Sequence, residues 1–295
     1  MKTRLCDLLQ IRYPIIHGAV PVPQKAQLAA AVSEAGGLGT AFSLVKPEEL
    51  REQIREIRKL TDKPFSINLP LLFGEKTARD IAEVVMEEKV KVVTTSSGSP
   101  EIFTRRFKEA GITVMHVVST VKHAIKAEAA GVDVIIASGA EAGGWQSYDE
   151  VTTMVLIPQV ASAVRVPVVA AGGIADARGF VAALALGAVG VQIGTLFIAT
   201  VEAGAEKEWN DDIIRATDTS TEITGRGKRP LRVFKVDFLK EARPGTEVKP
   251  QASPRGTAGQ VAGLITRVSP VKEIIDEIIG GSTAISQSIA SSLSG

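Results

Sequence analysis

Short apolar runs rich in β-branched residues recur between residues 14 and 195, and stretches with a helical spacing of apolar residues separate them. Each run is almost continuously apolar, which is typical of parallel strands buried on both faces. The pattern predicts strands at 14–18, 37–42, 65–70, 91–97, 113–118, 132–138, 167–173 and 190–195. It predicts helices at about 24–36, 47–59, 75–88, 100–110, 120–130, 151–164 and 176–186.

This alternation of eight strands with helices places the chain in the α/β class. Eight βα units favour a closed (β/α)8 barrel, the TIM barrel, over an open doubly wound sheet. The open sheet is still an alternative at this point, because hydrophobic periodicity cannot show whether a sheet closes on itself.

The pattern breaks after the eighth strand. Residues 202–253 are polar and contain the loop-like sequences GRGKRP and ARPGTEVKP, so we expect a small cap or insertion beside the barrel mouth. The sequence VSPVKEIIDEII then predicts a final amphipathic C-terminal helix, and the Ser-rich end predicts a flexible tail. The expected division is a barrel from 1–201 and 254–280, a cap from 202–253 and a tail from 281–295.

The composition narrows the class of protein. The chain has 295 residues and a formal net charge of +1, which gives no case for a broad nucleic-acid surface. Cys6 is its only cysteine, which excludes an internal disulfide and a Cys-rich metal site and suits a reducing cytoplasm. The sequence has no apolar run long enough for a membrane helix and no secretory signal, so it predicts a cytoplasmic protein without a membrane segment or a bound metal.

Two loops near the end of the predicted barrel carry the clearest chemistry. AAGGIAD ends the seventh strand and QIGT ends the eighth. We therefore expect the two loops to place four residues close together, namely Gly172, Gly173, Gly194 and Thr195. In a TIM barrel these two loops form the recurring phosphate site, where backbone N–H groups bind the anion. The alternative is that the glycines only make tight turns, but two such loops in this order favour phosphate binding.

The earlier strands also end in residues that leave room for a ligand. Asn68 ends the third strand, where it either hydrogen-bonds a ligand or forms a turn. The stretch VDVIIASGAEAGGWQS, residues 132–147, runs from a strand into small residues and then into Trp145. Backbone clearance with few charges, next to a phosphate site, suits a flat aromatic ring with a phosphate tail, such as FMN.

Eight segments follow one another as YPIIHGAV, LAAAVSEAGGLG, KPFSINL, VVTTSSGSP, GVDVIIASGAEAGG, PVVAAGGIAD, VQIGTLFIAT and GTAGQVAGL. Together they resemble the nitronate monooxygenase (2-nitropropane dioxygenase-like) family and its relative, FMN-dependent enoyl-ACP reductase II. The resemblance implies a TIM barrel that holds FMN, with Gln260 beside the substrate pocket. It implies cofactor contacts from His17, Gly18, Asn68, Gly143, Gly144, Gly172, Gly173, Gln192, Gly194 and Thr195.

In the family the EAGG segment is followed by a histidine, the proposed proton-transfer group, but this chain has Trp145 there. An indole is neither acid nor base at neutral pH, so we expect Trp145 to form a wall of the substrate pocket. His17 and His116 are candidate catalytic residues in place of the missing group, and the alternative for each is a structural histidine. The basic GRGKRP segment is either a solvated loop or a grip for the phosphate of a phosphopantetheine or NADPH.

The resemblance implies an FMN-dependent oxidoreductase, and the sequence favours a nitronate monooxygenase-like activity. An alkyl nitronate arrives deprotonated, so its oxidation by O2 does not require the missing base. The alternatives are an enoyl thioester reductase with NAD(P)H as the reductant, an NAD(P)H:quinone reductase, and a flavin-binding protein with little turnover. The partner is then a small-molecule substrate, and the resemblance leaves open an acyl carrier protein or a second copy in a homodimer.

Overall fold

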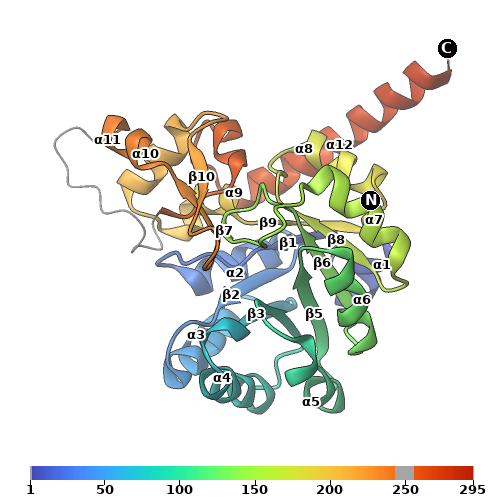
Figure 1. Cartoon of the computed structure of the whole chain (residues 1–295), viewed down its shortest axis with the longest axis vertical. Helices are drawn as coiled ribbons and strands as arrows, with labels where there is room; N and C mark the ends of the chain where they lie inside the picture. Colours follow the sequence, from blue (N-terminus) through green and yellow to red (C-terminus); the bar gives the residue numbers. More distant parts are fainter. Residues whose placement is uncertain (1, 243–255, 295) are drawn as a thin grey trace.

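The computed structural model of the chain describes residues 2–242 and 256–294 (Figure 1). Eight parallel strands form one sheet, and each lies within a predicted strand. In chain order they are β1 (Ile15–His17), β2 (Gly39–Phe42), β3 (Phe65–Pro70), β4 (Val92–Ser96), β5 (Thr113–Val118), β6 (Val134–Ser138), β8 (Val168–Ala171) and β9 (Gly190–Ile193).

The sheet closes on itself, because its first and last strands are also bonded. The strand order is β1-β9-β8-β6-β5-β4-β3-β2, and a parallel bridge joins Ile16 of β1 to Leu38, next to β2. The His17 N–H donates to the Leu38 carbonyl at 2.9 Å, and the Leu38 N–H donates to the Ile15 carbonyl at 2.9 Å. The fold is therefore a (β/α)8 TIM barrel, and the open doubly wound sheet is excluded.

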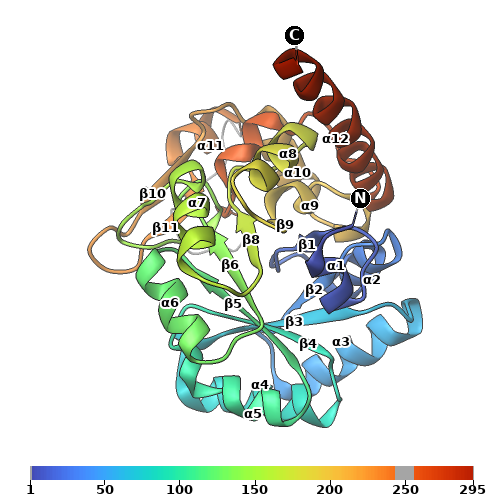
Figure 2. The ribbon, with the colours of Figure 1, turned by 90° about the vertical axis from the view of Figure 1, so that its right-hand side faces the viewer.

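Helices surround the barrel, as Figure 2 shows. They are α2 (Lys25–Glu34), α3 (Pro47–Leu60), α4 (Glu75–Glu87), α5 (Thr104–Glu109), α6 (Val121–Ala129), α7 (Thr153–Ala163) and α8 (Ala177–Ala185). In α3 the apolar residues Leu50, Ile54 and Ile57 recur at helical spacing and are buried. The α5 helix begins later than predicted, because the 3-10 turns η2 (Pro100–Ile102) take up its first residues.

Successive residues of each strand face the barrel interior and the helices alternately. The inner positions near the amino ends of the strands are apolar and pack with Leu5 and Leu9 of α1 (Arg4–Leu9), a short helix that the sequence pattern did not predict. Nearer the carboxyl ends the inner positions become polar and small, with Thr94, Ser96 and Ser138 among them. This change of side chain leaves space at one end of the barrel.

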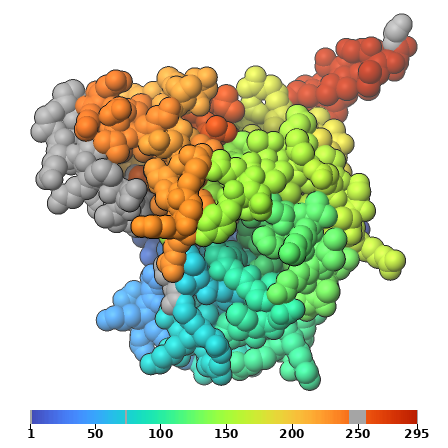
Figure 3. All heavy atoms as spheres, viewed as in Figure 1, coloured from blue at the N-terminus to red at the C-terminus, as the bar shows by residue number. Residues whose placement is uncertain are grey.

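The segment after β9 is more ordered than the loops that the sequence suggested. It contains α9 (Thr195–Ile198), η3 (Val201–Ala203), α10 (Lys207–Arg215), β10 (Thr221–Thr224), β11 (Leu231–Phe234) and α11 (Val236–Ala242). We call residues 201–242 the cap. Its hairpin forms a second, antiparallel sheet with β7 (Gly144–Trp145), in the order β10-β11-β7. In Figure 3 the cap, in orange, lies beside the yellow-green segment that carries β7. Most of ARPGTEVKP lies outside the described residues.

The chain ends in the helix α12 (Val271–Ser294), which follows η5 (Gln260–Leu264). Its first turns are buried and lie beside α8, where a Cβ added at Gly281 would come within 2.8 Å of the Ala177 side chain. Its last turns project away from the barrel (Figures 1 and 2). The described part of the expected tail is thus helical, while the predicted domain boundaries stay a prediction. None of the helices described is both long and apolar enough to cross a membrane.

Candidate functional site

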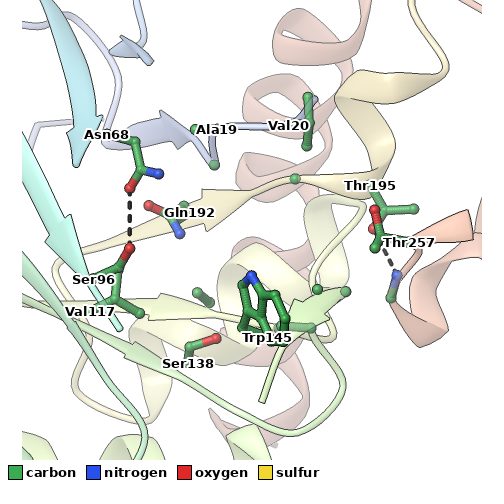
Figure 4. A pocket seen from close by; sticks show the side chains of 18 of the residues that line it. Ala19, Val20, Asn68, Ser96, Val117, Ser138, Trp145, Gln192, Thr195 and Thr257 are labelled. Carbon is green, nitrogen blue, oxygen red and sulfur yellow. Dashed lines mark hydrogen bonds between the residues drawn. The ribbon is translucent and has the colours of Figure 1, made fainter. Parts of the chain in front are cut away.

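The polar carboxyl ends of the strands surround a cavity of about 550 Å3, which we call the barrel cavity. This volume lies in the range of small-molecule sites, and this end of a TIM barrel is where active sites form. Its walls come from strand ends, from the loops after β8 and β9, and from residues 257–261. In Figure 4 Asn68, Ser96 and Gln192 lie together at one end of the cavity, and Thr195 and Thr257 lie at the other.

The loops after β8 and β9 line the cavity with backbone, as the two glycine motifs predicted. Gly173 has φ of +72°, which itself favours glycine. Gly194 is different, since its φ of −110° suits any residue. A Cβ added there would have as its nearest neighbour the Val20 side chain at 3.7 Å, an ordinary contact. Neither the backbone nor protein packing requires glycine at 194, which is the observation expected where a ligand approaches the chain closely.

Packing explains other glycines of the small-residue run. A Cβ at Gly139 would come within 2.1 Å of Thr153 Oγ1, and one at Gly143 within 2.7 Å of the Gly259 nitrogen. These two glycines therefore let segments of the chain pass close together. Gly144, with φ of +82°, is the exception, because a Cβ there would meet no described atom within 4 Å. Only part of this run thus provides clearance for a ligand.

The cavity binds through hydrogen-bonding groups more than through charge. No Lys or Arg of the described residues lines it, and Glu141 is the only acidic residue that does. The Glu141 carboxylate accepts hydrogen bonds from the Thr153 N–H at 2.9 Å and from Thr153 Oγ1 at 2.9 Å, so it caps α7. Thr195 Oγ1 accepts from the Gly259 N–H at 2.9 Å and can donate its own hydrogen to an anion in the cavity.

Polar side chains line the other end of the cavity, where they can hydrogen-bond a ligand. Asn68 and Gln192 face the cavity from β3 and β9, and Ser96 Oγ donates to Asn68 Oδ1 at 3.5 Å. Ser96 and Ser138 also line the cavity, although the sequence pattern did not single them out. The signal was present, because each is the last residue of its strand and faces inward, as Asn68 does two residues before the end of β3.

His17 points away from the cavity, although its neighbour Gly18 lines it. Its side chain is 1% exposed and packs edge-on against Phe197, with 5.5 Å between ring centroids. Its Nδ1 accepts a long hydrogen bond of 3.4 Å from the Thr40 N–H. Burial lowers the pKa of His17 to about 3, because the charged ring loses its water. His17 is therefore neutral at pH 7, and a catalytic role for it stays a prediction that this orientation does not favour.

His116 also occupies an outward position on its strand. It is 4% exposed, and 2.7 Å separate its Nδ1 from Thr95 Oγ1. Burial, with a smaller contribution from the nearby His123, lowers the pKa of His116 to about 4. It lines a second cavity that adjoins the barrel cavity, and it does not line the barrel cavity itself. Its catalytic role stays a prediction.

Trp145 lines the barrel cavity, and the cap holds it there (Figure 4). Its backbone pairs with Leu231 of β11, and its side chain is 43% exposed. Arg232, on the same cap strand, is buried and donates from Nε to the Ala140 carbonyl at 2.7 Å. The segment that contains Gln260 also reaches the site, where Thr257, Gly259 and Val261 line the cavity. Gln260 itself is exposed and does not line the cavity.

Comparisons with known proteins agree with this geometry. A model of the nitronate monooxygenase family matches residues 2–83 and 74–256. The structure of FabK from Thermotoga maritima is similar, with a TM-score of 0.88, 40% sequence identity and 99% of each chain covered. A probable nitronate monooxygenase from Staphylococcus saprophyticus is 33% identical over 285 residues, which cover 81% of this chain and 80% of the relative. In Mycobacterium tuberculosis, (3aS,4S,5R,7aS)-5-hydroxy-7a-methyl-1-oxo-octahydro-1H-indene-4-carboxyl-CoA dehydrogenase is 32% identical over 265 residues, covering 88% of this chain and 74% of the relative.

Proposed function

Because the chain belongs to the nitronate monooxygenase family and is an enzyme of the oxidoreductase type, we propose that it is an FMN-dependent reductase of enoyl thioesters. NAD(P)H is the electron donor in this proposal. A hydride ends on the β carbon of the thioester and a proton on its α carbon, so the double bond is reduced and NAD(P)+ is released. The substrate is a small molecule, free or attached to a carrier protein.

The cavity suits FMN as the cofactor, and Gly194 is the observation that carries this assignment. Gly173, Gly194 and Thr195 would hold the phosphate with backbone N–H groups and a hydroxyl. Asn68, Gln192 and the nearby serines would contact the ring system. FMN, when bound, supplies a ring that accepts a hydride and passes it on.

The likeness to FabK supports the reductase over nitronate oxidation. FabK is the enoyl-ACP reductase II of this family, and it shares 40% of its residues with this chain over almost the full length of both. The M. tuberculosis relative, whose name includes a CoA thioester, points to the same class of compound. Trp145 cannot supply the proton for the α carbon. Since the Trp145 side chain is 43% exposed, the site admits water, which is the proton source in this proposal.

Nitronate oxidation, which the sequence alone favoured, is the second candidate. Trp145 is the observation in its favour, because a nitronate is already deprotonated and needs no base from the protein. The apolar indole would then form one wall of a small substrate site, with O2 as the final electron acceptor.

Anaerobic mixing of the FMN-loaded protein with each donor tests these alternatives. We expect NADPH or NADH to bleach the flavin absorbance at once, and crotonyl-CoA added afterwards to restore it. Bleaching by ethyl nitronate but by neither dinucleotide would transfer the assignment to nitronate oxidation. Bleaching by none of the three would identify a flavin-binding protein with little turnover.

A further inference from the structure

A second cavity of about 490 Å3, which we call the side chamber, adjoins the barrel cavity. It lies among the loops that follow β4, β5 and β6, the helix α6, and the cap residues Arg229 and Pro230. Ser97, Val117, Ser138 and Trp145 line both spaces. The two cavities therefore meet beside Trp145, and a molecule that occupies the side chamber can reach the space assigned to FMN.

The side chamber differs in chemistry from the barrel cavity. Its basic lining residues are His116, His123, Lys126 and Arg229, and no Asp or Glu of the described residues lines it. Lys126 Nζ has one acidic neighbour outside the lining, Glu101, at 3.5 Å. The remaining walls are rich in hydroxyl groups, from Ser97, Ser99, Ser119, Ser147 and Tyr148. Such a lining recognises an anion that is joined to a neutral, hydrogen-bonding chain.

Two residues of the side chamber indicate that the fold holds this space in shape: one side chain is buried, and the other residue has a strained backbone. His116 lines the side chamber, is 4% exposed, and is held in orientation by Thr95 Oγ1 at 2.7 Å from its Nδ1. Ser97, at the junction of the two cavities, has φ of +57°, a left-handed conformation that L residues other than Asn and Asp rarely adopt. Strained residues of this kind gather at ligand sites.

The structure also divides the basic GRGKRP segment into parts with different roles. Arg226 forms an ion pair with Glu150, with 2.9 Å between Nη2 and Oε2, and does not line the side chamber. Arg229 lines it, and the Tyr148 hydroxyl donates to the carbonyl of the adjacent Lys228. Arg229 therefore borders the side chamber, which Lys126 of α6 also lines.

We propose that the side chamber binds the phosphate-bearing arm of the second substrate, with Lys126 and Arg229 on the phosphate and the hydroxyl-lined wall and His116 along the arm. Trp145 stands where the arm turns toward FMN. This inference rests on the proposed function. The phosphate ester has two sources in that reaction, the pantetheine arm of the thioester and the nicotinamide dinucleotide, and the same chemistry binds either.

The test is a Lys126→Gln, Arg229→Gln double variant of the FMN-loaded protein, with Lys122→Gln as its control. Lys122 is an exposed lysine on the same helix that does not line the chamber. Calorimetry with CoA and with NADP+ measures phosphate binding without turnover. We expect the double variant to bind one of the two at least tenfold more weakly, the loss of one charge-assisted hydrogen bond or more, and the control to match the wild type.

The steady-state measurement identifies the source of the phosphate. A tenfold rise of KM for crotonyl-CoA, with no rise for crotonyl-N-acetylcysteamine, which lacks phosphate, assigns the arm to the thioester. A rise of KM for NADPH alone assigns it to the dinucleotide. The inference is overturned if wild type binds neither CoA nor NADP+, if the double variant binds both as wild type does, or if the control loses as much. Failure of the proposed function is a separate result, because it is the absence of anaerobic flavin bleaching by NAD(P)H.

Discussion

The two sides of the barrel cavity are built in different ways. The glycine loops after β8 and β9 belong to short, contiguous motifs, and each is fixed by its own strand. The wall at Trp145 is assembled from segments far apart in sequence, because β7 is held by β11 and by Arg232, more than 80 positions further along the chain. The wall proposed to hold the cofactor, the cofactor side, is thus determined by local sequence, whereas the wall proposed to face the substrate, the substrate side, depends on how the cap docks.

The largest expected effect concerns the cofactor side. Gly194→Val should weaken FMN binding by on the order of 3 kcal/mol, because the added methyl groups enter the space assigned to the phosphate. Fluorescence titration with FMN measures this. Without FMN, the variant and the wild type should unfold at the same temperature, since a Cβ at 194 meets its nearest protein atom only at 3.7 Å.

Gly143→Ala supplies the matched contrast. Its Cβ would lie within 2.7 Å of the Gly259 nitrogen, so this variant should lose thermal stability even without FMN. If Gly194→Val instead destabilises the FMN-free protein as much as Gly143→Ala does, the loop after β9 is a structural turn and not a cofactor cradle.

The next effect concerns the substrate side. Trp145→His would introduce a group with a pKa of about 6.5 when unperturbed, which is suited to proton transfer at neutral pH. For nitronate oxidation, the second candidate function, we expect the ratio of rates on nitroethane and ethyl nitronate to shift toward the neutral nitroalkane by about 100-fold, the lower end of general-base catalysis. Steady-state assays of the wild type and of Trp145→His on both compounds measure this ratio. An unchanged ratio would place the side chain of residue 145 away from the reacting atoms.

Acid should act on the cofactor side through His17, which packs against the helix that follows Gly194. The pKa of His17 is about 3 in the folded protein, well below the usual 6.5, so the unfolded chain binds the proton more tightly between these values. His17 therefore contributes stability above pH 6.5 that is lost as the pH falls toward 3. The free energy of unfolding should decrease by up to about 1.4 kcal/mol per pH unit from this residue.

Urea denaturation at pH 7, 6 and 5 measures that slope, and His17→Gln should make it shallower. His116 acts in the same direction, because its pKa is lowered to about 4. Equal slopes for wild type and His17→Gln would contradict the assignment of His17 as a buried neutral residue.

The smallest effect is expected for Trp145→Ala. Because the indole is only partly buried, its removal should raise KM for the thioester about fivefold. This corresponds to the loss of about 1 kcal/mol of binding free energy from apolar contact. FMN affinity should not change. A loss of FMN instead of substrate would move Trp145 from the substrate side of the comparison to the cofactor side.

The sequence predicted the barrel strands well, but it did not predict the cap strands or the short helix α1. Each barrel strand is buried on both faces, so its sequence is largely apolar and its position could be located within a few residues. The strand β10 is harder to recognise, because Ile223 is the only apolar residue among its four and the buried Thr221 is polar. The six-residue helix α1 is too short for its periodicity to be distinctive.

The placement of site residues was predictable only as far as the backbone decides it. Glycines of a strand-end loop line the cavity with their backbone, whereas a histidine one position away faces the opposite side of the sheet, as His17 does beside Gly18. Alternation along the strand contained that information. The side chamber could not be anticipated, because Ser97, Lys126 and Arg229 meet only after the barrel closes and the cap docks.

The pairing of β7 with β11 has a consequence for how such a protein can change over time. Two pairs of strand residues join the cap to the wall of the cavity, Leu231 with Trp145 and Arg232 with Gly144, and side-chain hydrogen bonds such as Arg232 Nε to the Ala140 carbonyl add to them. The barrel that carries the glycine loops is continuous without this hairpin. Exchange of the hairpin together with residues 144–148 between family members should therefore transplant substrate preference as a unit, while the inherited cofactor site is left intact.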